Sequence, residues 1–269
     1  MVESFFTPVD PAAGGWEATE ACAGPWSEQM QHGGPPSALL VRQAELEARE
    51  TRDDLVAHRV AVDFLGPVAV GRVDVHAQIV RSGRTVVLVD TELSVAGRTC
   101  LHARVWLIRR EVAEPTPTAT GDDPAIPGPD DVAETREWAF PYARHIEWRP
   151  VVGGGFDPGP AQVWCRPRIP LVPADIDLTP MSGLQRAVIV GDSGSGVSSE
   201  LSWDEWAFLN IDLDVHLLRQ PHGEWLLLDS RTRLGPAGTG LASTTFRDLT
   251  NGTPTVVGTG AQTLVVSRR

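Results

Sequence analysis

The stretch LNIDLDVHLL, residues 209–218, alternates apolar and polar side chains, which is typical of a half-buried β-strand. It follows a predicted helix, TPMSGLQRAVIV at residues 179–190. The same order occurs earlier in the chain, where the predicted helix PPSALLVRQAELEARE at residues 35–50 precedes the strand VAVDFLGPV at residues 60–68. The chain therefore contains two helix–strand units.

The two units share a register. Asp63 and Asp212 lie 149 positions apart, and Gly34 and Gly183, each near the start of a helix, are also 149 positions apart. This common spacing between helix and strand indicates a duplication.

Further strand-like segments follow each unit, and Ala96-Gly97 is a plausible hairpin turn between two of them. A long helix followed by an antiparallel meander, occurring twice, is an α+β plan. We predict a double hotdog, that is, two tandem repeats in which an antiparallel sheet wraps around a central helix. The additional strands are expected at residues 72–80, 84–95 and 98–108 in the first half and at residues 223–234, 240–249 and 255–267 in the second.

Between the halves, residues 111–134 are rich in Pro and acidic residues and show no periodicity, which is typical of an exposed connection. We therefore predict an N-terminal hotdog at residues 1–110, a Pro/acid-rich linker at residues 111–145 and a C-terminal hotdog at residues 146–269.

The composition limits the classes of function. The net charge of −12 argues against a nucleic-acid or anionic-membrane partner, because binding phosphates requires clustered cations. The start of the chain does not resemble a signal peptide, and no apolar run approaches the roughly 20 residues of a membrane-spanning helix. Cys22, Cys100 and Cys165 lack metal-ligand spacing and are expected to be buried thiols. We expect a cytoplasmic protein without a metal or redox cofactor.

The motif GDSGSG, residues 191–196, raises the question of a serine hydrolase, since Gly-Asp-Ser-Gly presents the nucleophile of trypsin-like proteases. The approach to Ser193 is the later part of a helix, whereas an α/β-hydrolase serine follows a strand. His145 and Asp157 could be proposed as partners, but no surrounding motif supports either. We interpret GDSGSG as a flexible helix end and Ser193 as structural.

The chain resembles the TesB-like acyl-CoA thioesterases, which are double-hotdog hydrolases, and in particular the compact actinobacterial members. The resemblance extends over nearly the whole length, and the combination of HGGPP with VDFLGPV is its most specific part. It is carried by FFTPV (5–9), GPW (24–26), QHGGPPSALL (31–40), VDFLGPVAVG (62–71), NIDLDVHLLR (210–219), GEWLLLDSRTRLGPAGTGLA (223–242) and GAQTLVV (260–266).

The resemblance implies that a strand Asp, a hydroxyl on the next strand and a Gln on the last strand hold a water molecule. Carried over by motif, these catalytic residues are Asp212, Thr232 and Gln262, with Ser230 as the alternative to Thr232. Asp212 would accept the proton of the water. Asp63, the duplicate of Asp212, is expected to be structural. The nine Trp residues are expected to fill the cores and the interface between the two halves.

The substrate is expected to bind at the start of the first helix. His32, Gly33 and Gly34 are the predicted binding residues, because a helix N-terminus presents free N–H groups to a developing oxyanion. Two departures from the family pattern concern the site: Pro35 replaces the usual Gln or Asn, and Leu218-Arg219-Gln220 replaces His-Arg-Pro.

The implied activity is hydrolysis of an acyl-CoA substrate to a free acid and CoA. A non-catalytic acyl-CoA or acyl-carrier binding protein is the main alternative, motivated by Pro35 and Leu218. A hotdog enoyl-CoA hydratase is disfavoured, because no GDxNPxH-like motif surrounds His216. A homodimer of the double-hotdog chain is compatible with the sequence, and the acyl chain is not determined by any readable motif.

Overall fold

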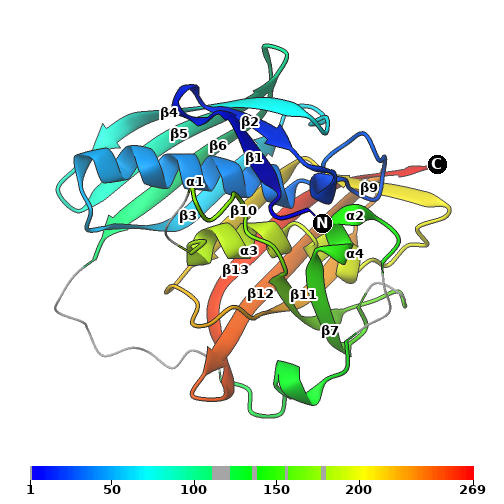
Figure 1. Cartoon of the computed structure of the whole chain (residues 1–269). Helices are drawn as coiled ribbons and strands as arrows, with labels where there is room; N and C mark the ends of the chain where they lie inside the picture. Colours follow the sequence, from blue (N-terminus) through cyan, green and yellow to red (C-terminus); the bar gives the residue numbers. More distant parts are fainter. Residues whose placement is uncertain (1, 111–121, 135–137, 155–156, 177–179) are drawn as a thin grey trace.

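The computed structural model describes residues 2–110, 122–134, 138–154, 157–176 and 180–269. The strands of these residues form a 13-stranded antiparallel sheet that wraps around two helices (Figure 1). In chain order the main elements are β1 (Phe6–Asp10), β2 (Gly15–Ala18), α1 (Gly34–Thr51), β3 (Leu55–Phe64), β4 (Arg72–Ser82), β5 (Val86–Val95), β6 (Arg98–Arg109), α2 (Pro141–Arg144), β7 (Ile146–Val152), β8 (Ala161–Pro167), α3 (Gly183–Gly191), α4 (Gly194–Val197), β9 (Trp206–Asn210), β10 (Asp212–Leu217), β11 (Leu226–Leu234), β12 (Thr239–Thr250) and β13 (Thr253–Arg268).

The strand order confirms the α+β double hotdog and is the same in both halves. From the centre outward, the first half runs β3-β6-β5-β4-β2-β1 and the second runs β10-β13-β12-β11-β8-β7, with β9 added against β13. The halves join where β3 pairs with β10, and there Asp63 lies directly opposite Asp212. The two aspartates that share the 149-residue spacing therefore lie at the seam, that is, the pairing of β3 with β10 that joins the two halves. The predicted boundaries at residues 110/111 and 145/146 stay predictions, and part of the predicted linker lies outside the described residues.

The helices α1 and α3 pack against each other inside the wrapped sheet. The start of α1 lies against the later part of α3. The approach is so close that a side chain at Gly34 would collide with the backbone oxygen of Ile189. Farther along both helices, Gln185 of α3 donates a 2.6 Å hydrogen bond to Glu45 of α1. The helices are therefore antiparallel, and the C-terminal end of α3 meets the N-terminal end of α1.

The GDSGSG segment contains a helix end, as the sequence predicted, and this helix end is buried. Helix α3 ends at Gly191, and the short helix α4 begins at Gly194. Asp192 and Ser193, which lie between them, are only 6% and 7% exposed. The turn is buried because the start of α1 covers it.

The predicted strand at residues 209–218 is interrupted at Ile211. Residues up to Asn210 pair with the end of β13, and residues from Asp212 onward pair with its earlier part and with β3. Ile211 is 49% exposed, and the buried positions shift by one residue on passing it, from Phe208 before it to Leu213 after it. Asn210 and Asp212 therefore point to opposite faces of the sheet.

The core lies between the sheet and the helices, and its largest fully buried side chains include Trp16, Trp164 and Tyr142. Cys22, Cys100 and Cys165 are buried and form no disulfide, as expected. None of the described helices combines the length and the hydropathy needed to cross a membrane.

Candidate active site

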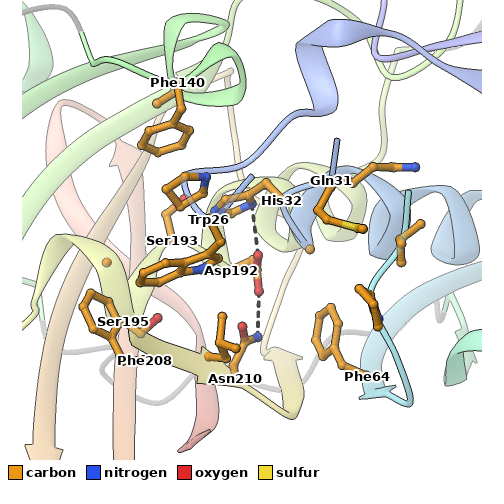
Figure 2. A pocket seen from close by; sticks show the side chains of 18 of the residues that line it. Trp26, Gln31, His32, Phe64, Phe140, Asp192, Ser193, Ser195, Phe208 and Asn210 are labelled. Atoms are coloured by element: carbon orange, nitrogen blue, oxygen red, sulfur yellow. Dashed lines mark hydrogen bonds and ion pairs between the residues drawn. The ribbon is translucent and has the colours of Figure 1, made fainter. Parts of the chain in front are cut away.

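A cavity of about 550 Å³ lies where the two halves meet. Its wall comes from the loop before α1, the end of β3, the segment around α2, the α3–α4 turn and β9. Figure 2 shows His32, Asp192 and Asn210 side by side at its centre, with aromatic side chains around them. Most of the lining is apolar, and Asp192 supplies a carboxylate to it.

Asp192 is held by donors from three parts of the chain. His32 Nδ1 lies 3.0 Å from Asp192 Oδ2, and Asn210 Nδ2 donates to Oδ1 over 2.8 Å (Figure 2). Gln262 Nε2 donates to the backbone oxygen of Asp192 over 3.0 Å and approaches Oδ1 at 3.4 Å. The pre-α1 loop, β9 and β13 thus converge on one carboxylate.

These contacts decide the charge of Asp192. Burial on its own raises the pKa of the Asp192 carboxyl, but attraction to His32 and hydrogen bonds from His32, Asn210 and the backbone N–H of Gly33 outweigh burial. The pKa therefore lies below its usual value, and the group is a buried carboxylate at neutral pH. The start of α1 also favours a negative charge at this position.

The N–H groups at the start of α1 face the pair formed by His32 and Asp192. The Gly33 N–H is directed at Asp192, and the Gly34 N–H lies 3.2 Å from His32 Nδ1. Pro35 and Pro36 have no N–H. Gly33 lines the cavity, and a side chain there would collide with Phe64 and Asp192. This helix N-terminus therefore lies against Asp192 and His32, and the predicted binding of an oxyanion there stays a prediction.

His32 is fixed as a cavity residue. Its ring stacks on that of Tyr142 with centroids 3.7 Å apart and planes inclined by 6°. The Tyr142 hydroxyl donates to the backbone oxygen of Ile189 over 2.7 Å, which anchors the stack to α3. His32 was predicted from the HGG motif to contact substrate, and the structure places it in the cavity wall.

Asp212 is not brought together with Gln262, and the predicted arrangement of these two side chains is therefore corrected. Asp212 accepts hydrogen bonds from the backbone N–H of Thr263 and, over 2.9 Å, from its hydroxyl. Thr263 is exposed, and Gln262, its neighbour in β13, is 2% exposed and points inward. The bend at Ile211 is the reason, because it turns Asp212 to the outer face.

Gln262 and Thr232 support the α3–α4 turn from the inner face of the sheet. Gln262 Oε1 accepts the Ser195 N–H over 3.0 Å. Thr232 Oγ1 lies 2.9 Å from Ser198 Oγ, and Ser230, its alternative, pairs with Thr244 over 2.8 Å. Gln262 reaches Asp192, whereas the hydroxyls of the two β11 residues lie behind the turn.

Ser193 lines the cavity, but its surroundings do not activate it as a nucleophile. Its hydroxyl lies 3.0 Å from the Tyr142 hydroxyl, whose own proton is donated to Ile189. Ser193 therefore donates to Tyr142, and its partner is an uncharged phenol: burial raises the pKa of Tyr142 well above its usual value.

Several Trp residues form walls of the cavity between the two halves. Trp26 stacks on Trp203 at 5.3 Å, and both meet Phe208 edge-on. Trp138 and Trp148 line another side of the cavity. Trp164, in contrast, is a fully buried core residue, as expected.

The duplication relates the start of α3 to the start of α1. At the start of α3, however, side chains fill the space that corresponds to the cavity. Ser182 caps α3, and Pro221 and Gln220 pack tightly against Gly183. The buried Glu45 carboxylate is bonded to Gln185 there. Leu218, one of the departures from the family pattern, is 64% exposed and is not among the residues that line the cavity.

Two functional candidates were missed from the sequence, Asp192 and Asn210. Asp192 stands in the GDSG motif that drew attention to the serine beside it, so the motif was a usable signal. Asn210 begins the NIDLD run, two positions before the Asp that was chosen. A strict alternation would place both on one face, so the pattern could not separate them.

Comparison with known families and structures agrees with this architecture. The family model described as acyl-CoA thioesterase N-terminal domain matches residues 22–108, and the corresponding C-terminal domain model matches residues 115–266. The curated proteins include no significant match to the chain.

Solved structures of similar fold extend over nearly the whole chain. A hot dog fold protein from Alicyclobacillus acidocaldarius is 16% identical, with 97% of this chain and 95% of that one covered at a TM-score of 0.71. The tesB protein of Mycobacterium avium subs paratuberculosis is 19% identical, with 97% and 95% covered at 0.67. The acyl-CoA thioesterase II TesB2 of Mycobacterium marinum is 14% identical, with 98% and 95% covered at 0.67. At these identities the likeness shows the fold.

Proposed function

Because the chain belongs to the acyl-CoA thioesterase family, we propose that it hydrolyses acyl-CoA thioesters in the cavity around Asp192. The observation that carries the proposal is the contact of a buried, ionised carboxylate with His32 and Asn210 inside a mostly apolar cavity. An apolar cavity suits an acyl chain, and polar side chains held in place by a carboxylate can orient a water molecule beside it.

Roles within the site follow from the contacts. Asp192 and His32 supply the polar centre, and the carbonyl of the Asn210 side chain can accept a hydrogen bond from the attacking water. Gln262 is a positioning residue, because both ends of its amide are used to hold the α3–α4 turn. The reaction needs no acyl-enzyme, so Ser193 has no covalent role.

The direct test is release of thiol from a panel of acyl-CoA substrates, measured with a thiol reagent. We expect turnover of at least one member of the panel. Tight binding of acyl-CoA without thiol release from any chain length would instead support the non-catalytic alternative, and hydration of crotonyl-CoA would support a hydratase.

Replacing Ser193 by Ala tests the covalent alternative. We expect kcat/KM to stay within about tenfold of the unmodified protein, because the change removes only a neutral hydrogen bond to Tyr142, worth ~0.5–1.5 kcal/mol. A loss of about 10³-fold or more, together with labelling of Ser193 by a fluorophosphonate, would contradict the proposal.

The acyl chain is proposed to occupy the side of the cavity formed by Trp26, Trp203 and Phe208. Gly196 in α4 faces this side, and a Cβ at that position would lie 3.4 Å from the Trp203 ring. The distance allows Ala with little adjustment, whereas a larger side chain would fill the space beside the ring.

Replacing Gly196 by Leu is therefore expected to lower kcat/KM for dodecanoyl-CoA relative to butanoyl-CoA by tenfold or more, since one methylene in such a pocket discriminates by roughly 10–200-fold. Gly196→Ala should give a smaller change in the same direction. The matched control is Gly128→Leu, outside the cavity lining, which should leave the ratio unchanged. If Gly196→Leu leaves the ratio of kcat/KM for the two substrates unchanged, the acyl chain binds elsewhere.

A further inference from the structure

His32 Nδ1 has two neighbours that require opposite protonation states. Asp192 Oδ2, 3.0 Å away, can only accept a hydrogen bond, whereas the Gly34 N–H, 3.2 Å away, can only donate one. A single ring nitrogen is either a donor or an acceptor in the neutral imidazole, so the two hydrogen bonds cannot form together.

The ionised state of Asp192 decides between them. A hydrogen bond to a charged acceptor is roughly twice as strong as a neutral one, and a lone pair on Nδ1 would face the carboxylate at 3.0 Å. Nδ1 therefore carries the proton and donates it to Asp192. The neutral ring then keeps its lone pair on Nε2.

Nε2 is free to act on a substrate or a water molecule. It makes no hydrogen bond to any residue in the part of the chain that the structure describes. The ring lines the cavity, and stacking on Tyr142 restricts its rotation. This combination of a carboxylate-held Nδ1 and an open Nε2 is the arrangement of a histidine general base.

Asp192 is poorly suited to take the proton itself. Its carboxylate interacts with His32, Asn210, Gln262 and the Gly33 N–H, which together match the roughly four acceptor sites of a carboxylate. The same hydrogen bonds lower the pKa of the Asp192 carboxyl and so make it a weaker base.

We propose that His32 is the catalytic general base, acting through Nε2, and that Asp192 fixes its tautomer. This inference rests on the proposed thioester hydrolysis. The water oxygen forms a bond to the thioester carbon, the carbonyl electron pair moves onto its oxygen, and the proton of the water passes to Nε2. The carbonyl then re-forms as the C–S bond breaks, and the thiolate takes the proton from Nε2, leaving a carboxylic acid and CoA.

The pH profile of kcat/KM tests the assignment. Protonation of Nε2 removes the base, so the unmodified protein should lose activity on the acidic side. The titratable groups that contact the His32 ring are Asp192 from the α3–α4 turn and Tyr142 from α2. Burial raises the pKa of Tyr142 well above its usual value, so its phenol stays neutral on the acidic side of the profile.

His32→Gln should lower kcat/KM by about 10²–10⁴-fold, and its residual rate should lack the acidic limb. Tyr142→Phe, the matched variant, keeps the stacking ring and should retain the limb. If His32→Gln keeps the acidic limb or most of its rate while the unmodified protein hydrolyses the thioester, His32 is not the base. If no thioester is hydrolysed by either protein, the proposed function itself fails.

A measurement that does not depend on activity is ¹⁵N NMR of the histidine side chains, with the His32 signal assigned by its absence from His32→Gln. We expect His32 as the Nδ1–H tautomer in the unmodified protein. In Asp192→Asn the amide can donate to Nδ1, and the signal should change to the Nε2–H form. An Nε2–H tautomer in the unmodified protein would overturn the proposal.

Discussion

Replacing Asp192 by Asn is expected to lower kcat/KM for the best acyl-CoA substrate by about 10³–10⁴-fold, a loss like that seen when the carboxylate of a Ser-His-Asp triad becomes an amide. Asn has nearly the same shape, so the side chain still fits between His32 and Asn210. It lacks the charge, however, and its N–H group can donate to His32 Nδ1 and leave the proton on Nε2. Thiol release measures the effect, and the free energy of unfolding checks that the variant folds.

Asp212→Asn is the matched control. Asp212 begins β10, two residues after the cavity residue Asn210, but its carboxylate accepts hydrogen bonds from Thr263 on the outer face of the sheet. We expect its kcat/KM to change no more than about twofold to threefold, since surface substitutions usually act within ±0.5 kcal/mol. If Asp212→Asn loses most of its kcat/KM while Asp192→Asn stays active, Asp212 is the catalytic carboxylate, and the proposed active site around Asp192 is wrong.

Replacing Arg219 by Met is expected to lower the free energy of unfolding by about 3–5 kcal/mol, because it leaves a buried charge without its partner. Arg219 makes two 2.6 Å hydrogen bonds to Asp248, which is 0% exposed. The backbone N–H of His222 and the hydroxyl of Thr250 supply the remaining donors, and neither of these two groups carries a charge that compensates the carboxylate. Urea unfolding monitored by Trp fluorescence measures the loss.

Two further variants separate loss of charge from loss of packing. Arg219→Met combined with Asp248→Leu should recover a large part of the stability, because no buried charge remains. Arg231→Met, at an exposed position of β11, should change stability by no more than about 0.5 kcal/mol. A stable Arg219→Met protein would show that the pair contributes little.

The same pair predicts a dependence of stability on pH. Burial raises the pKa of the Asp248 carboxyl, but hydrogen bonds from Arg219, His222 and Thr250 and the charge of Arg219 outweigh it, and the pKa lies below the ordinary value of 3.8. A carboxyl with a lowered pKa in the folded state stabilises the protein above its unfolded pKa. The contribution of Asp248 is therefore present above pH 3.8 and is lost as the pH falls through the lower folded value.

The features that the sequence predicted correctly are those carried by local motifs and by the internal repeat. The prolines that open residues 35–50 marked the start of α1, and the common 149-residue register of Asp63 and Asp212 marked the two strands that meet at the seam. Strands β1, β2, β7 and β8 were not predicted, because these are short edge or next-to-edge strands with little alternation.

The sequence by itself determined the duplication, the double-hotdog class and the family, since these depend on motifs and periods within short segments. Only the tertiary structure decided which carboxylate faces the cavity. A one-residue bend at Ile211 turns Asp212 outward and Asn210 inward, and a strand pattern with a period of two does not reveal such a shift. Likewise, Asp192 becomes a site residue because antiparallel packing brings the end of α3 to the start of α1, a contact between segments about 160 residues apart in the sequence.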